Sequence, residues 1–167
     1  MKVMIFKPIE RCNSNCVYCD VVKHGDRSIM SLELLELIFQ KINEYLLNHP
    51  EENFQLIWHG GEPCLLGAEY FLKALDFQNK HCPQTASRIK HDVQSNLTMM
   101  SQEIIDAFKL LGINSVGTSY EPIPNIRGFG KKRDSESYNQ KFFEGVNLLE
   151  KNGFTWGGYL CYYQQGP

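Results

Sequence analysis

The chemistry of this chain centres on the stretch RCNSNCVYCD, residues 11–20, where three cysteines follow the spacing C-x3-C-x2-C. The loop holds three cysteines, Cys12, Cys16 and Cys19. Disulfide scaffolds need an even number of cysteines, and a structural zinc site uses four ligands, one more than the loop supplies. Three thiolates can instead bind three irons of a cubane 4Fe–4S cluster, which usually has four cysteine ligands. The fourth iron would then be open to a small chelating molecule.

Two other interpretations of this cysteine loop stay open. A zinc ion could use the three thiols together with a distant fourth ligand, for which the candidates are Cys64, Cys82, His24 and His59. Zinc sites more often pair C-x2-C units, so the spacing disfavours zinc. A purely packed cysteine cluster is favoured still less, because thiols in a loop have little core to fill.

A second group of candidate residues is the segment WHGGEP, residues 58–63. Gly60 and Gly61 would let the backbone come close to a ligand, and one or the other could adopt dihedral angles closed to other residues. Glu62 can accept a hydrogen bond from an ammonium group. Taken alone, the segment is equally typical of a turn that ends a strand.

Short β-rich runs alternate with longer helical patterns along the chain. Strands are predicted at 2–6, 54–60, 89–96, 114–120 and 154–163, and helices at 31–48, 67–81, 101–112 and 137–153. Ser31 is the predicted N-cap of the first helix. This alternation predicts a parallel sheet with right-handed crossovers.

In such a sheet the functional residues are expected in loops at the carboxyl ends of the strands. The cysteines follow the first strand, GGEP follows the second, Ser95 and Asn96 end the third, and Ser119 ends the fourth. About five strands and four helices predict an α/β fold whose barrel is incomplete. We therefore expect residues 1–167 to form one domain, either an open sheet or a fragment of something longer.

The cysteine spacing, with the aromatic Tyr18 directly before the last cysteine, resembles the signature of the radical S-adenosylmethionine (SAM) superfamily. GGEP resembles the motif that contacts the SAM amino group in that family. The resemblance implies a partial (β/α) barrel of the radical SAM type. It also implies a 4Fe–4S cluster on Cys12, Cys16 and Cys19, with the amino and carboxylate groups of SAM on the fourth iron.

Softer similarities point to the branch that contains anaerobic sulfatase maturases and SPASM-type peptide-modifying enzymes. QSNLT at 94–98 resembles its QTNGT stretch, VGTSYEP at 116–122 resembles its GISLDGP, and the loop of Arg127 resembles its arginine-bearing loop. Carried over, Ser119 and Arg127 would bind the carboxylate region of SAM, and Asn96 its ribose or methionyl part. The cofactor-binding residues implied by the resemblance are Tyr18, Gly60, Gly61, Glu62, Asn96, Ser119 and Arg127.

The chain departs from the pattern of this branch at three points. Leu97 replaces the usual glycine, residues 120–122 replace Leu-Asp-Gly, and the histidine before the arginine loop is absent. These departures concern the substrate side rather than SAM cleavage. The acid or base and the auxiliary-cluster cysteines of that branch lie beyond the position of residue 167, so the catalytic residue is unassigned.

The function implied is radical modification of a peptide or protein. In this family an electron from the reduced cluster cleaves the SAM sulfonium, and the 5′-deoxyadenosyl radical abstracts a substrate hydrogen. The electron donor would be a flavodoxin or ferredoxin. One alternative is a radical SAM enzyme that acts on a small molecule or nucleic acid. Another is a noncatalytic interaction module that binds zinc or a cluster.

The remaining cysteines and the aromatic residues of the second strand receive structural interpretations. Cys64, which follows GGEP, is interpreted as a small apolar filler rather than a ligand. Cys82 and Cys161 are interpreted as structural. Trp58 and His59 fit the strand pattern, which predicts a buried, hydrogen-bonded histidine rather than a catalytic one.

Composition narrows the class of protein. With 43% hydrophobic residues among 167, the chain can bury one substantial core, and its net charge of −2 suggests no polyanion-binding surface. Lys131, Lys132 and Arg133 are adjacent, but so short a run is typical of a solvated loop, so no nucleic-acid partner is expected. No run reaches the length of a secretory signal or a membrane span, which predicts a cytoplasmic protein without a membrane partner.

Overall fold

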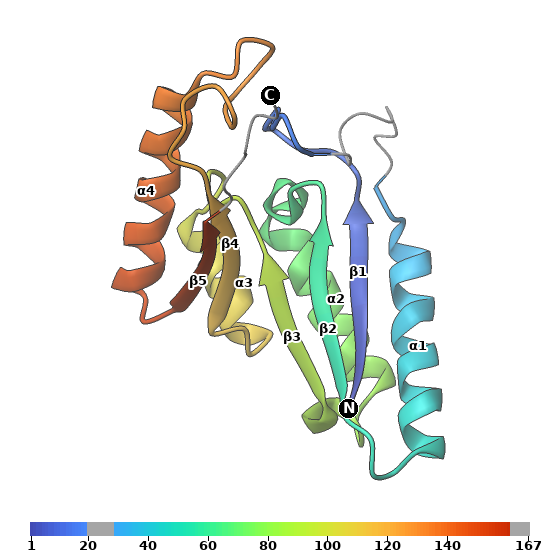
Figure 1. The fold of residues 1–167 in the computed structure, drawn as a ribbon. Helices are drawn as coiled ribbons and strands as arrows, with labels where there is room; N and C mark the ends of the chain where they lie inside the picture. The colour runs from blue at the N-terminus through green and yellow to red at the C-terminus, as the bar shows by residue number, and fades with distance from the viewer. Residues whose placement is uncertain (20–28, 161–167) are drawn as a thin grey trace.

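The computed structural model describes residues 1–19 and 29–160, in which strands and helices alternate (Figure 1). The strands are β1 (Lys2–Ile9), β2 (Phe54–Gly60), β3 (Ile89–Gln94), β4 (Ser115–Tyr120) and β5 (Thr155–Leu160). The helices are α1 (Leu32–Asn48), α2 (Gly67–His81), α3 (Gln102–Leu110) and α4 (Ser135–Lys151), with short 3₁₀ helices η1 (Pro63–Leu66) and η2 (Ala86–Arg88). None of the helices in this part of the chain is long and apolar enough to span a membrane.

The five strands form one parallel sheet in the order β1-β2-β3-β4-β5. Each strand therefore lies beside the next strand of the chain, as expected where strands and helices alternate. β1 and β5 are the two edges, so the described part of the chain is an open sheet and not a closed ring. The predicted α/β fold with five parallel strands is confirmed.

The element boundaries differ from the prediction by a few residues. β1 continues to Ile9, because it pairs with β2 again after an irregularity that follows Phe6. β3 ends at Gln94, so Ser95 and Asn96 lie just beyond the strand. The first difference lengthens the strand that leads into the cysteine loop. The second places Ser95 and Asn96 in the loop after β3, outside the sheet.

Some predictions fall outside the described residues. The proposed zinc ligand His24 is one of them. The end of the last predicted strand, together with Cys161, is another.

The helices cover one face of the sheet. In β2, Leu56 and Trp58 are buried, whereas the alternating residues Gln55 and Ile57 are partly exposed. A parallel strand covered on both faces is apolar throughout, so this alternation indicates that one face is open. In Figure 1, α2 and α3 lie behind the strands.

Aromatic side chains fill the layer between the sheet and the helices. The Trp58 ring lies 4.9 Å from Phe6 of β1 and 5.0 Å from Phe71 of α2, measured between ring centroids. Phe71 in turn lies 5.0 Å from Phe108 of α3. All four side chains are buried. Truncating such a ring to alanine typically costs about 3–5 kcal/mol, so this layer fixes the strands on a rigid base.

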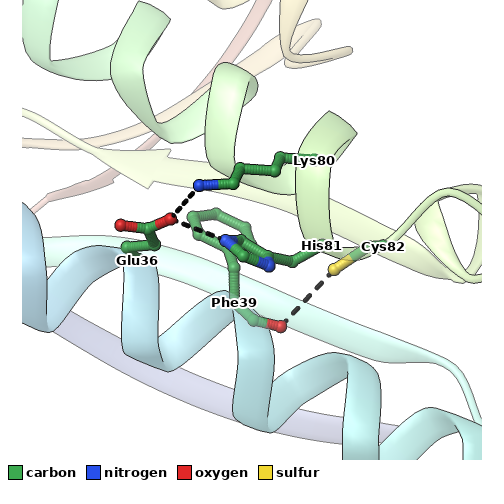
Figure 2. Close-up of polar contacts among 5 residues, drawn as sticks. All are labelled: Glu36, Phe39, Lys80, His81 and Cys82. Atoms are coloured by element: carbon green, nitrogen blue, oxygen red, sulfur yellow. Dashed lines mark hydrogen bonds and ion pairs between the residues drawn. The ribbon is translucent and has the colours of Figure 1, made fainter.

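Polar contacts join α1 to the end of α2, as Figure 2 shows. The Glu36 carboxylate lies 2.7 Å from Lys80 Nζ and 2.8 Å from His81 Nε2. Cys82, directly after α2, donates its thiol hydrogen to the Phe39 carbonyl oxygen at 3.5 Å. Cys82 is fully buried, which agrees with the structural role predicted for it.

Candidate functional site

A pocket of about 200 Å³ lies at the carboxyl ends of β1 to β4. The ten residues that the sequence predicts for the site all line it: Cys12, Cys16, Tyr18, Cys19, Gly60, Gly61, Glu62, Asn96, Ser119 and Arg127. Its other lining residues are Ser14, His59, Gln94 and Ser95. The parallel sheet thus brings four separate segments of the chain to one place.

Burial controls the acidity of the cysteine thiols. It raises the pKa of Cys12 to about 11, and the backbone N–H of Ser14, 3.4 Å from the sulfur, counters part of that rise. Burial also raises the pKa of Cys16, and the positive charge of Arg127 lowers it in part. The metal-free thiols of Cys12 and Cys16 are therefore protonated at neutral pH, and binding a metal must release their protons.

The cysteines do not converge as ligands of one ion would. Within residues 1–19 and 29–160, no group of three or more Cys, His, Asp or Glu side chains could hold a single metal ion. In a cubane cluster each thiolate binds a different iron, so the thiolates surround the cluster instead of meeting at one atom. Cys64, a candidate zinc ligand, is 2% exposed in the hydrophobic core, which agrees with the filler role predicted for it.

Gly60 and Gly61 bring two backbone segments together. Gly60 has a φ of 111°, in a region that favours glycine. A β-carbon on Gly60 would overlap the carbonyl oxygen of Ile9, and one on Gly61 would overlap that of Arg11. The Gly61 N–H donates to the Ile9 carbonyl at 2.8 Å. The glycines thus let the end of β2 approach the backbone that leads into the cysteine loop, and their approach to a ligand stays a prediction.

Glu62 is 1% exposed, and its carboxylate has protein partners. Oε1 accepts hydrogen bonds from the Ser95 hydroxyl at 2.8 Å and from the Cys64 N–H at 2.9 Å. Oε2 accepts the Asn96 N–H at 2.7 Å. Burial raises the pKa of Glu62, and these donors counter part of the rise. The residue therefore fastens the end of β2 to the end of β3, while Oε2 keeps a second lone pair for a ligand.

Asn96 turns its side-chain amide toward the cysteine loop. Nδ2 donates to Asn13 Oδ1 at 2.9 Å and to Ser14 Oγ at 3.1 Å, and it lies 3.8 Å from the Cys12 sulfur. Oδ1 accepts the Thr98 hydroxyl at 2.8 Å. The side chain is thus engaged with the protein, so its immediate effect is to hold the cysteine loop against the end of β3.

Arg127 reaches the pocket from the loop between β4 and α4. Its guanidinium donates to the Ser119 carbonyl oxygen, and Cζ lies 5.1 Å from the centroid of the Tyr138 ring. The residue is 6% exposed, and its Nε has no hydrogen-bond partner in the described part of the chain. A buried guanidinium with a free N–H group is suited to bind a carboxylate.

The loop that carries Arg127 pairs with the cysteine loop along the backbone. The Asn15 N–H donates to the Gly128 carbonyl at 2.9 Å, and the Val17 N–H donates to the Ile126 carbonyl at 2.9 Å. Tyr18, which is 36% exposed, lies at the edge of the pocket beside this pairing. The two loops form one structural unit although they are far apart in the sequence.

One histidine differs from its prediction, and another that the sequence analysis did not single out is buried. His59 is hydrogen-bonded, since its Nδ1 accepts the Gly60 N–H at 2.7 Å, but it is partly exposed and lines the pocket, so the prediction of a buried residue is wrong. The buried histidine of the sheet is His91. Its Nδ1 accepts a hydrogen bond from Trp58 Nε1 at 3.1 Å, and its Nε2 lies 2.6 Å from Gln78 Oε1.

Comparison with known proteins identifies the family. The model of the Radical SAM superfamily matches residues 6–165. The serine-type anaerobic sulfatase-maturating enzyme of Bacteroides thetaiotaomicron is 27% identical over 164 residues, which cover 92% of this chain and 37% of that protein. The cysteine-type enzyme of Clostridium novyi is 28% identical over 124 residues, which cover 69% of this chain and 32% of that protein. The chain therefore spans about a third of the length of these curated relatives.

Solved structures share the fold. Native anSMEcpe with bound AdoMet has a TM-score of 0.77 at 23% identity, covering 94% of this chain and 42% of that one. The complex of that protein with AdoMet and the Kp18Cys peptide has a TM-score of 0.78 at 24% identity, with the same coverage. These likenesses confirm the predicted partial (β/α) barrel. Because the family model covers nearly the whole chain, the chain belongs to the radical SAM superfamily, an enzyme family whose cofactors are a 4Fe–4S cluster and SAM.

Proposed function

We propose that this chain forms the core of an enzyme that cleaves SAM reductively and modifies a peptide or protein. When bound, the cluster and SAM would supply the radical chemistry that removes a hydrogen atom from the substrate. The observation that carries the proposal is the single pocket that collects three cysteine thiols, a buried carboxylate and a buried guanidinium. An iron-sulfur cluster and a zwitterionic amino-acid cofactor need these groups.

The cluster would be held by the thiolates of Cys12, Cys16 and Cys19. The charge of Arg127 favours the thiolate of Cys16 over its thiol. The Ser14 N–H lies beside the Cys12 sulfur and favours that thiolate in the same way. These residues therefore offset the cost of burying negative charge in the loop.

The pocket offers complementary charge to both ends of the amino-acid part of SAM. Its carboxylate fits the free Nε–H of Arg127, beside the Ser119 hydroxyl. Its ammonium fits the remaining lone pair on Glu62 Oε2 and the adjoining backbone of Gly60 and Gly61. Asn96 would act on SAM through the cysteine loop that it holds.

Relatives support a peptide or protein substrate. Two curated relatives are named as sulfatase-maturating enzymes, and one solved neighbour contains a bound Cp18Cys peptide. We further propose a flavodoxin or ferredoxin as electron donor and a cytoplasmic location, where thiols stay reduced.

Anaerobic reconstitution tests the proposal. The wild-type chain should bind about four irons and, once reduced, convert SAM to 5′-deoxyadenosine and methionine. Cys16→Ala should lose iron and cleavage together, because it removes one cluster ligand. Cys82→Ala is the matched control, since it removes a buried thiol that does not line the pocket, and it should keep both properties. Stoichiometric zinc without iron, or cleavage by Cys16→Ala, would contradict the proposal.

Isotope transfer separates the substrate classes. With a peptide substrate deuterated at the reacting carbon, deuterium should appear in 5′-deoxyadenosine. Transfer from a deuterated small metabolite or nucleotide, and from no peptide, would favour the alternative substrate classes and leave SAM cleavage intact.

A further inference from the structure

The three adjacent basic residues Lys131, Lys132 and Arg133 lie in a turn that backbone hydrogen bonds close. Phe129 and Asp134 exchange backbone hydrogen bonds of 3.0 and 3.3 Å, and the Arg133 N–H donates to the Gly130 carbonyl at 3.2 Å. Residues 130–133 therefore form the tip of a closed turn, which we call the basic turn. Its backbone is fixed by hydrogen bonds at both ends.

The basic turn rests directly on the cysteine loop. Asn15 Nδ2 donates to the Gly130 carbonyl oxygen at 3.2 Å, and Arg133 Nε donates to the Asn15 carbonyl oxygen at 2.9 Å. Phe129 also forms an isolated antiparallel bridge with Ser14. Asn15 directly precedes Cys16, a proposed cluster ligand. Figure 1 shows both segments at the same end of the sheet, beyond the carboxyl ends of the strands.

The two lysines of the basic turn form no ion pair within the described residues. Lys131 and Lys132 are exposed, and no carboxylate of the described residues forms an ion pair with either of them. On the helices, by contrast, Lys41, Lys73, Lys80 and Lys141 are each paired with an acidic side chain.

The acidic residue nearest in sequence to the basic turn, Asp134, forms no ion pair with it. The Asp134 carboxylate accepts the Ser137 N–H at 3.1 Å and the Ser137 hydroxyl at 2.6 Å, as the N-cap of α4. A chain of net charge −2 thus carries a local positive surface against its cysteine loop.

We infer that the basic turn is a docking surface for an acidic protein that donates one electron, of the flavodoxin or ferredoxin class. The inference rests on the proposed function, in which a cluster on the cysteine loop must be reduced. The donor loses one electron and the cluster gains it, with no bond made or broken. The pocket side of the loop is needed for SAM, so the donor must approach from the outer side. Opposite charges at that side steer the encounter and orient the two redox centres.

Nucleic acid, the other negatively charged class of partner, fits the basic turn less well than an acidic protein does. Within residues 1–19 and 29–160, the only run of three adjacent basic residues is the one in this turn, which is short for a surface that follows a phosphate backbone. An acidic protein surface of similar size needs only such a local patch.

The test compares two double variants of the reconstituted, cluster-loaded chain. Lys131→Gln with Lys132→Gln removes two charges from the basic turn, and Lys41→Gln with Lys73→Gln removes two from the outer faces of α1 and α2. Both pairs are exposed, so both variants should fold. The probe is an acidic flavodoxin. Its dissociation constant is measured by fluorescence anisotropy at low and high salt, and its rate of cluster reduction by loss of visible absorbance.

The basic-turn variant should bind flavodoxin at least about tenfold more weakly at low salt and be reduced correspondingly more slowly. Its reduction by dithionite should be unchanged, and the helix variant should match the wild type in every assay. Equal behaviour of the two variants with flavodoxin would overturn the inference while leaving the proposed function intact. So would loss of binding to single-stranded RNA with unchanged reduction by flavodoxin. A chain that assembles no cluster would overturn both.

Discussion

Leu97 stands where the QTNGT stretch that it resembles has glycine, and its backbone conformation is one that favours glycine. It has a φ of 63°, in the left-handed region. This conformation costs a residue with a β-carbon about 1–2 kcal/mol. The strain is held because the side chain is fully buried and the Leu97 N–H donates to Ser95 Oγ at 3.0 Å. Gly145 of α4 also leaves room for the Leu97 carbonyl, which a β-carbon there would overlap.

Two substitutions of Leu97 separate strain from packing. Leu97→Ala keeps the strained conformation and loses the buried side chain, so it should lower the free energy of unfolding by about 2–5 kcal/mol. Leu97→Gly loses the same side chain but relieves the strain, so it should be more stable than Leu97→Ala by about 1 kcal/mol. Urea unfolding of both variants measures the difference. A more stable alanine variant would show that the turn is not strained at this position.

At the scale of secondary-structure elements, His91 links two strands to a helix. It lies on β3, accepts a hydrogen bond from Trp58 of β2 and contacts Gln78 of α2. Burial lowers the pKa of His91 to about 4 from an unfolded value of 6.5, and the nearby Asp92 counters a small part of this. The neutral ring of His91 is therefore part of the packing between the sheet and α2, the layer that supports the strand ends at the candidate site.

This link predicts a pH dependence of stability. Because the pKa of His91 is lower in the folded state, the unfolded chain binds more protons between pH 6.5 and 4. Stability is therefore lost as the pH falls through that window, by about 3 kcal/mol from this residue when the loss is complete. Urea unfolding between pH 7 and 4 measures the slope.

Two histidine variants identify the source of that slope. His91→Gln should be less stable at pH 7 and should flatten the dependence on pH. His49→Gln, an exposed control at the end of α1, should leave the slope as it is in the wild type. An unchanged slope in His91→Gln would rule out this assignment.

At the scale of the whole molecule, the sequence predicts where the site lies better than how it is built. Alternating strands and helices imply a parallel sheet, and a parallel sheet brings the ends of successive strands together. That reasoning alone collects Cys12, Glu62, Asn96 and Ser119 in one pocket. It depends only on local patterns and on the handedness of the connections.

Contacts between distant loops could not be predicted in this way. Nothing in the sequence shows that Asn96 holds the cysteine loop, that Gly61 packs on Arg11, or that residues 126–133 pair with residues 14–17. These contacts depend on the path of each loop after its strand, which no periodicity encodes. The sequence accordingly predicts a solvated loop for residues 131–133, whereas in the structure this segment contacts Asn15.

In the proposed function, the three-cysteine loop leaves one iron open for SAM within this pocket. Electron paramagnetic resonance of the reduced, reconstituted chain, recorded with and without saturating SAM, tests it most directly. We expect the signal of a reduced 4Fe–4S cluster whose g values change when SAM is added, because the amino and carboxylate groups would bind the open iron. A cluster signal that SAM leaves unchanged would contradict it.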